Sequence, residues 1–196
     1  MAENKVRLGI IGLGAEGGMY AKFIDGGMVP NMVIGAICDI LPEKKEAADE
    51  YGVPFYTDYK EMIASGNVDA IVTTVPHYLH PEMGIYGLEH GMHTLLEKPV
   101  GVYTKQAREV IEFAETKPDL KFGVFFNQRT NPLYKDLKAI MDSGELGRLR
   151  HTSWIITTWW RPQPYYAQSD WRATWGGEGG GVLVNQAPHQ LDLWQW

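Results

Sequence analysis

Residues 6–17 of this chain read VRLGIIGLGAEG, a short apolar strand that runs into a glycine-rich turn. Its glycines have the spacing Gly-x-Gly-x-x-Gly, which is typical of a dinucleotide site. The first allows a tight turn, the second lets the backbone approach a pyrophosphate, and the third lets a helix pack against the strand. The helix N-terminus presents free N–H groups and a positive dipole end to the phosphates. The residues expected to bind cofactor here are Gly12, Gly14, Ala15, Glu16 and Gly17.

An acidic residue at the expected distance supports this interpretation. A second apolar strand, residues 32–38, ends at Asp39, which lies 22 residues after Gly17. A carboxylate about 20 residues after such a turn binds a ribose 2′-hydroxyl. It also repels a 2′-phosphate, and no arginine follows it, so we predict NAD rather than NADP. The alternative is an ordinary glycine-rich turn with an aspartate at a strand end.

The composition limits the kinds of partner. The 196 residues carry a net charge of −6 and no basic cluster, which argues against nucleic acid or an anionic membrane surface. The one cysteine, Cys38, falls in a predicted buried strand, so we expect no disulfide and a reducing compartment. No apolar run approaches the ~18 residues of a membrane span, and the N-terminus lacks a signal-peptide cleavage site. We expect a soluble, cytoplasmic protein.

Up to residue 126, apolar runs alternate with helical patterns. This alternation predicts an α/β fold, a Rossmann-type doubly wound parallel sheet, for a domain of residues 1–126. After the first strand, the expected strands are 32–38, 56–57, 68–75, 93–97 and 121–126, and the expected helices are 19–26, 43–51, 58–65, 81–90 and 104–116.

The pattern changes after Asn127, and all seven tryptophans follow residue 150. We predict a second domain, residues 127–196, with a helix at 133–143, a long strand at 150–160 and part of a further helix at its end. These elements cannot bury the tryptophans, so we expect the sequence to stop inside this domain.

A lysine follows the predicted strand 93–97, in the sequence Glu97-Lys98-Pro99. Ligands of open α/β sheets bind beyond the carboxyl ends of such strands. Burial against a cofactor would lower the pKa of Lys98 and let it exchange a proton with a substrate hydroxyl. The alternative is a surface lysine in front of a proline that begins a helix.

Three polar residues near the end of the sequence are spaced i, i+4 and i+7, and a helix would place them on one face: Asn185, His189 and Asp192. His189 suits proton transfer near neutral pH. The alternative is a core histidine hydrogen-bonded to Asp192.

Further polar side chains follow the predicted strand 68–75. We expect Thr74, Pro76, His77 and His80 to lie near the cofactor, together with Glu97 and Lys98 after the predicted strand 93–97. We expect no metal site, because no carboxylate or cysteine cluster accompanies the two histidines. The aromatic segment of residues 154–175 suits either core packing or stacking on a sugar. In the second case Arg172 would bind sugar hydroxyls.

The glycine turn, Asp39, Glu97-Lys98-Pro99 and the glycine run before His189 together resemble the glucose–fructose oxidoreductase/inositol dehydrogenase (Gfo/Idh/MocA) family. The resemblance implies that a C-terminal α/β domain with an open, mostly antiparallel sheet begins after the Rossmann domain. It also implies a nicotinamide cofactor, a sugar or polyol substrate and homo-oligomers formed through the open sheet. Lys98 matches the catalytic lysine of the family and His189 its catalytic histidine, and both are expected to contact substrate.

Two positions depart from the family pattern. Asn185 stands where inositol-dehydrogenase-like members have an aspartate, and His77 stands where an asparagine is usual. An asparagine orients a hydroxyl but cannot accept its proton, so we expect Asn185 to position substrate.

The leading hypothesis is an NAD-dependent oxidoreductase that acts on a CH–OH group of a sugar or polyol. The two alternatives are a cofactor-binding sensor without turnover and an NAD-dependent enzyme of redox-assisted elimination or glycoside cleavage.

Overall fold

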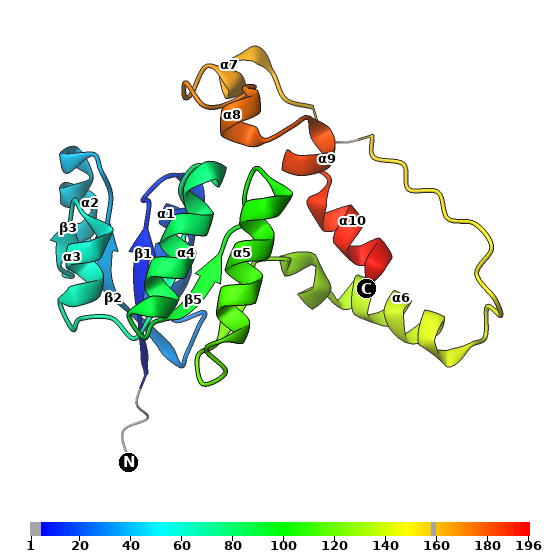
Figure 1. The fold of residues 1–196 in the computed structure, drawn as a ribbon, viewed down its shortest axis with the longest axis horizontal. Helices are drawn as coiled ribbons and strands as arrows, with labels where there is room; N and C mark the ends of the chain where they lie inside the picture. The colour runs from blue at the N-terminus through cyan, green and yellow to red at the C-terminus, as the bar shows by residue number, and fades with distance from the viewer. Residues whose placement is uncertain (1–4, 158–159) are drawn as a thin grey trace.

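The computed structural model describes residues 5–157 and 160–196. Its first part is one six-stranded sheet in the order β3-β2-β1-β4-β5-β6, and every adjacent pair of strands is parallel (Figure 1). The strand order reverses direction between β1 and β4, which is where ligands of such sheets bind. The predicted doubly wound parallel sheet is therefore confirmed.

The strands are β1 Val6–Ile11, β2 Met32–Cys38, β3 Phe55–Tyr56, β4 Ala70–Thr73, β5 His93–Leu96 and β6 Phe122–Val124. The helices of the sheet region are α1 Ala15–Asp25, η1 Pro42–Lys44, α2 Lys45–Glu50, α3 Tyr59–Ala64, η2 His77–Leu79, α4 His80–Glu89 and α5 Thr104–Glu115. The helices that follow the sheet are η3 Asn127–Thr130, α6 Pro132–Ser143, α7 Gln163–Tyr166, α8 Trp175–Glu178, α9 Val182–Asn185 and α10 Pro188–Gln195.

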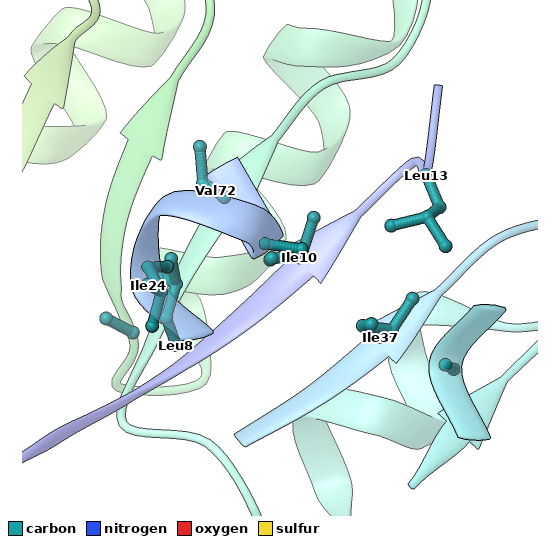
Figure 2. Packing of buried hydrophobic residues seen from close by; sticks show 9 residues of the cluster. Leu8, Ile10, Leu13, Ile24, Ile37 and Val72 are labelled. Atoms are coloured by element: carbon teal, nitrogen blue, oxygen red, sulfur yellow. The ribbon is translucent and has the colours of Figure 1, made fainter. Parts of the chain in front are cut away.

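The apolar core lies between the sheet and its helices. On one face, Ile24 of α1 packs with Leu8 and Ile10 of β1 and Val72 of β4 (Figure 2). On the other face, a second cluster around Met62 and Ile71 packs beneath α3 and α4. Because both faces are covered, the central strands β1 and β4 are mainly apolar and do not alternate regularly with polar residues.

Short boundary differences come from the parallel register. The predicted strand 68–75 shortens to β4, because only residues 70–73 pair with both neighbours. The first helix begins at Ala15, four residues before the predicted start, because Gly14 is already its N-cap.

The prediction of a long strand at 150–160 is wrong for the described part of that segment. Residues 150–157 and 160 have no regular structure, and residues 158–159 lie outside the described residues. The segment follows α6 along the outside of the molecule in a wide arc, with no strand beside it (Figure 1). A strand needs a partner for its N–H and C=O groups, and none pairs with it in the described chain. The open antiparallel sheet implied by the family resemblance is therefore not seen.

After this arc the chain returns over the carboxyl ends of the strands. Helices α7 and α8 lie above the sheet, and α9 and α10 lead down from them to the N-terminal half of α6 (Figure 1). Contacts between α8 and η2 and between α10 and η3 fix this return. Within the described residues, no helix has both the length and the apolar character to span a membrane.

Candidate active site

The glycine turn has the geometry that the sequence predicts. Gly12 has a φ of 94°, which favours glycine. A Cβ on Gly17 would lie 2.0 Å from the carbonyl oxygen of Gly12, so α1 packs directly on the turn. Thr74 holds the same turn, because its hydroxyl donates to the Gly12 carbonyl at 2.5 Å. A Cβ on Gly14 would meet no atom within 4 Å, so space for a phosphate remains above it.

Asp39 lies beside this turn at the end of β2. Its Oδ2 accepts the backbone N–H of Leu13 at 2.7 Å, and its Oδ1 accepts that of Leu41 at 3.0 Å. These two bonds orient the carboxylate at the rim of the dinucleotide site. Each oxygen retains a lone pair for a ribose hydroxyl.

Lys98 extends from the carboxyl end of β5 to the C-terminal segment. Its Nζ donates to the backbone carbonyl of Asn185 at 2.7 Å. The Lys98–Pro99 peptide bond is cis. Burial lowers the pKa of the Lys98 ammonium; the carboxylates of Glu97 and Glu16 oppose this change. Lys98 is therefore a half-buried amine at the site expected for a proton-transfer group.

Glu97, which we expected near the cofactor, connects elements of the sheet region. Its Oε1 accepts the hydroxyl of Tyr20 on α1, and its Oε2 accepts the backbone N–H of Lys98 at 3.0 Å. The ring of Tyr20 packs on that of Phe125, 4.9 Å between centroids. Burial raises the pKa of the Glu97 carboxyl. Glu97 thus links the helix of the glycine turn to the backbone of Lys98; no sequence motif indicates Tyr20.

The two histidines after β4 lie inside the protein. His80 is fully buried, with Nδ1 2.7 Å from the carbonyl of Pro99 and Nε2 2.9 Å from that of Val75. His77 packs edge-on against Trp171, 4.9 Å between ring centroids. Burial, together with the charges of His80 and Lys98, lowers the pKa of His77 to about 3. His80 therefore ties the ends of β4 and β5 together, and His77 supports the returning segment.

That returning segment contains a buried acid that the sequence analysis missed. Glu178 is 4 % exposed, and its Oε1 accepts the side-chain amide of Asn185 at 2.6 Å. Arg172, predicted to bind substrate, lies with Nη1 3.7 Å from the same oxygen and donates to the hydroxyl of Tyr165. The available signal was a single charged residue within a run of glycines, residues 176–181.

His189 and Asp192 share α10, but Asn185 belongs to α9, so the single helical face that the spacing predicted is wrong. The chain breaks between them because Pro188 fits only the first turn of a helix. Asp192 accepts two bonds at 2.7 Å from Arg129, so it is not the hydrogen-bond partner of His189.

The ring of His189 lies edge-on to Phe126, 6.1 Å between ring centroids. Its Nδ1 is buried and has no hydrogen-bond partner among the described residues. Burial and the charge of Lys98 lower the pKa of His189, and Asp192 raises it. The site therefore holds a half-buried imidazole whose Nδ1 can form a further hydrogen bond.

No group of three or more histidine, cysteine or acidic side chains suited to a metal ion occurs in residues 5–157 and 160–196. A hollow of about 420 Å³ lies against the cluster just described and includes Glu178 and Asn185 in its wall. A hollow of about 560 Å³ on the outside of α5 contains none of the predicted site residues.

A parallel sheet in this order, with a glycine turn over α1 and an acid at the end of β2, defines a dinucleotide-binding protein of the Rossmann class. The family model for an oxidoreductase family with an NAD-binding Rossmann fold, GFO_IDH_MocA, matches residues 6–126. The model for the GFO/IDH/MocA C-terminal domain matches residues 134–196. The chain belongs to the Gfo/Idh/MocA oxidoreductase family, and the predicted cofactor, NAD, is confirmed as the cofactor of its Rossmann domain.

Curated relatives agree with this assignment. The chain is 26 % identical over 200 residues to inositol 2-dehydrogenase/D-chiro-inositol 3-dehydrogenase of Lactiplantibacillus plantarum, a match that covers 100 % of this chain and 53 % of that protein. It is 33 % identical over 193 residues to the uncharacterized oxidoreductase YrbE of Bacillus subtilis, covering 97 % of this chain and 53 % of the relative. The chain thus spans about half the length of the curated relatives that it matches.

Solved structures share the fold as well. The WlbA dehydrogenase of Bordetella pertussis, in complex with NADH and UDP-GlcNAcA, superposes with a TM-score of 0.87 at 28 % identity, over 98 % of this chain and 59 % of that one. The scyllo-inositol dehydrogenase of Lactobacillus casei, with bound NAD(H) and scyllo-inositol, gives a TM-score of 0.70 at 26 % identity, over 73 % of this chain and 42 % of that one.

Proposed function

We propose that the protein is an NAD-dependent oxidoreductase that acts on a CH–OH group, or the corresponding carbonyl, of a sugar or polyol. The observation that carries this proposal is the contact between Lys98 and Asn185, 2.7 Å from Nζ to the carbonyl oxygen. It brings a half-buried amine from the sheet region and a polar cluster from the C-terminal region to one place. The relatives named above that act on inositols support the substrate class.

Lys98 is the proposed proton acceptor. Burial makes its ammonium less favourable than it is in water and so lowers its pKa, because desolvation penalises the charge. A lysine with a lowered pKa exchanges protons with a hydroxyl more readily near neutral pH. The backbone bond to Asn185 holds the amine in place while it does so.

His189, Asn185 and Arg172 are the proposed substrate residues. The buried, unpartnered Nδ1 of His189 would gain a hydrogen bond from or to a substrate hydroxyl. Asn185 is 7 % exposed and would position a hydroxyl without accepting its proton. The guanidinium of Arg172 lies over the rings of Tyr165 and Trp171, 4.3 and 4.6 Å from their centroids, in an aromatic wall suited to a sugar face.

The cofactor-side residues fit NAD. The open space above Gly14 and the N-terminus of α1 suit a pyrophosphate, and the Asp39 carboxylate suits a ribose diol. Among the other residues after β4 and β5, we propose cofactor contacts for Thr74, Pro76 and Glu97. We propose that His77 and His80 support these residues through their own packing and hydrogen bonds. When bound, the nicotinamide supplies hydride transfer, and this chain supplies orientation and proton transfer.

The experiment is NADH formation, followed by absorbance, with a panel of sugars and polyols. We expect Lys98→Met to lower kcat by about 10²- to 10⁴-fold with NAD affinity retained. Lys105→Met is the matched control, since Lys105 is an exposed lysine on α5 whose side chain is 88 % exposed. An unchanged rate in Lys98→Met would contradict the role of Lys98.

The same assay separates the other classes of protein. NAD binding without NADH formation on any substrate would favour a sensor. Product formation without net NADH would favour redox-assisted elimination.

We further propose a homo-oligomer in the full-length protein. Among the described residues, α6 has none that is buried, and it exposes Leu133, Leu137 and Ile140. Light scattering that gives a monomer mass for the full-length protein would contradict this proposal.

A further inference from the structure

The carboxylate of Glu178 is a buried negative charge to which the proposed reaction assigns no role. Its Oε1 accepts from the amide Nδ2 of Asn185 at 2.6 Å, and its Oε2 accepts from the backbone N–H of Ala173 at 3.1 Å. The guanidinium of Arg172 lies 3.7 Å from Oε1. All three neighbours are donors, which suits a group that only accepts hydrogen bonds.

The bond to Ala173 stabilises an uncommon backbone conformation. Ala173 has a φ of 58°, in the left-handed region that L-residues with a side chain rarely adopt. Such a conformation persists only where its surroundings hold it. Glu178 is therefore the centre of a built arrangement and not a chance contact.

This arrangement decides the orientation of the Asn185 amide. A carboxylate cannot donate, so only the NH₂ end of the amide can face Glu178. The opposite end is then the carbonyl oxygen Oδ1, which only accepts. A substrate group that bonds to Oδ1 of Asn185 must therefore be a donor, and a hydroxyl meets this requirement whereas a carbonyl does not.

Asn185 also connects Glu178 to Lys98. Its main-chain carbonyl accepts Nζ of Lys98 at 2.7 Å while its side chain is held by Glu178. The hollow of about 420 Å³ beside them is lined by Glu178, Asn185, Tyr166 and Trp175, among others. The main-chain carbonyl of Asn185 thus binds the Lys98 amine, and its side-chain Oδ1 is the acceptor that it can offer to a ligand in the hollow.

We propose that Glu178 is a positioning residue of this site: it fixes the amide of Asn185 with Oδ1 available to a substrate hydroxyl, and it holds the residue whose carbonyl binds Lys98. The inference rests on the proposed function only where it names a substrate hydroxyl. The network itself is a property of the folded chain.

The first experiment exchanges the two groups and follows thermal unfolding without substrate. Asn185→Asp alone places a second carboxylate 2.6 Å from the first, and two such groups cannot both be ionised. We expect its unfolding midpoint at pH 8 to fall by roughly 5 °C or more, and by much less at pH 5, where the pair holds a proton. Adding Glu178→Gln restores an amide–carboxylate pair in reverse, and the midpoint should return most of the way.

The control is Glu43→Gln, at an exposed position, which should neither lower the midpoint nor rescue Asn185→Asp. If the fall in the unfolding midpoint of the double variant equals or exceeds the sum of the falls in the two single variants, the proposal is overturned. So would an Asn185→Asp deficit that is equal at pH 5 and pH 8, because a purely steric effect has no pH dependence.

The second experiment is kinetic and tests the hydroxyl. In Glu178→Gln the facing amide can donate or accept a hydrogen bond. The side-chain amide of Asn185 can then flip by 180° and exchange the positions of Oδ1 and Nδ2. We expect KM for a hydroxyl substrate to rise about tenfold, the value of one hydrogen bond, with a smaller change in kcat. An unchanged KM would overturn this part. Absence of turnover in the wild type would overturn the proposed function and leave the unfolding test standing.

Discussion

The two regions of this molecule are held together by different forces. In the described chain, every buried hydrophobic residue except Ala187 lies between Leu8 and Val110, within the sheet and its helices. The region after the sheet buries polar groups, such as Glu178 and Asn185, and exposes large apolar ones: Ile155 and Trp160 are each 82 % exposed. The sheet region thus has its own apolar core, and the C-terminal region is attached to it by polar and aromatic contacts.

This difference bears directly on the site. The cofactor side is built on a closely packed sheet, where a displacement of one atom is costly. The substrate side depends on a few contacts. Lys98 with Asn185 and His77 with Trp171 cross the boundary, and Arg129 with Asp192 joins α10 to η3, which directly follows the sheet. Changes in the sheet region should therefore act on the whole fold, and changes at the boundary should detach the second region.

The largest expected effect comes from Gly17→Ala in the sheet region. The new Cβ would lie 2.0 Å from the Gly12 carbonyl oxygen, so α1 must move away from the turn. We expect a loss of about 3 kcal/mol in the free energy of unfolding and loss of NAD binding, measured by urea unfolding and calorimetry.

The matched control for this change is one residue further along the same helix. Gly18→Ala meets no atom within 4 Å and should be neutral or stabilising, by up to about 1 kcal/mol. Equal NAD affinities in the two alanine variants would contradict the packing role of Gly17.

Acid should weaken the boundary at His77. Its pKa is lowered from the ordinary 6.5 to about 3 in the folded protein, so between pH 6.5 and pH 3 the unfolded chain binds a proton that the folded chain does not. Stability contributed by neutral His77 is therefore present above pH 6.5 and is lost as the pH falls towards 3. We expect a loss of about 2 kcal/mol across this window, since local opening around Trp171 relieves the rest.

The measurement is the free energy of unfolding against pH for the wild type and His77→Phe, which keeps an aromatic ring against Trp171. The variant should show a shallower slope between pH 3 and 6.5. A replacement of the exposed His151 by glutamine should leave the slope unchanged. A slope that is the same in all three proteins would contradict the assignment to His77.

Arg129→Ala tests the ion pair that attaches α10. The side chain of Asp192 is only 10 % exposed, so removing its partner leaves a carboxylate poorly hydrated. We expect a loss of about 1 to 2 kcal/mol, seen as faster hydrogen exchange and proteolysis in residues 182–196. The comparable pair Lys45–Asp49 in α2 is exposed on both sides, and Lys45→Ala should cost about 0.5 kcal/mol or less. Equal costs would show that the pair between η3 and α10 contributes no more to stability than an exposed ion pair does.

The smallest effects come from two helix caps of the same kind, one in each region. Asp58 accepts the backbone N–H of Lys60 at the start of α3, and Asn131 accepts that of Leu133 at the start of α6. Replacing either with alanine should cost about 1 kcal/mol locally. Asp58→Ala should lower the global unfolding midpoint, whereas Asn131→Ala should only increase hydrogen exchange in α6. A global shift of the same size in both variants would contradict the independence of the two regions.

The sheet region could be predicted from the sequence because its signals are local. Short apolar runs that alternate with helical patterns define the strands, and the glycine spacing defines the turn above α1. Two helix starts also depend on local residues, because the side chains of Asp58 and Asn131 cap α3 and α6. In each case the residues that make the structure lie within a few positions of one another.

The C-terminal region could not be predicted in the same way, because its structure depends on distant partners. The alternating pattern of residues 150–160 fits a strand, but no partner strand lies beside its described part. The spacing of Asn185 and His189 fits one helix, but Pro188 divides it. That Asp192 pairs with Arg129, 63 positions earlier, and that Glu178 faces Asn185 follow from the return of the chain over the sheet.

The most direct test of the central claim is an NMR titration of the Lys98 ammonium, assigned with Lys98→Met. This amine lies half-buried at the boundary and is held by the Asn185 carbonyl, and burial is the main influence on its pKa. We therefore expect a Lys98 pKa below the ordinary 10.5. A Lys98 pKa at or above 10.5 would show that the two regions do not enclose the amine, and would contradict its proposed role.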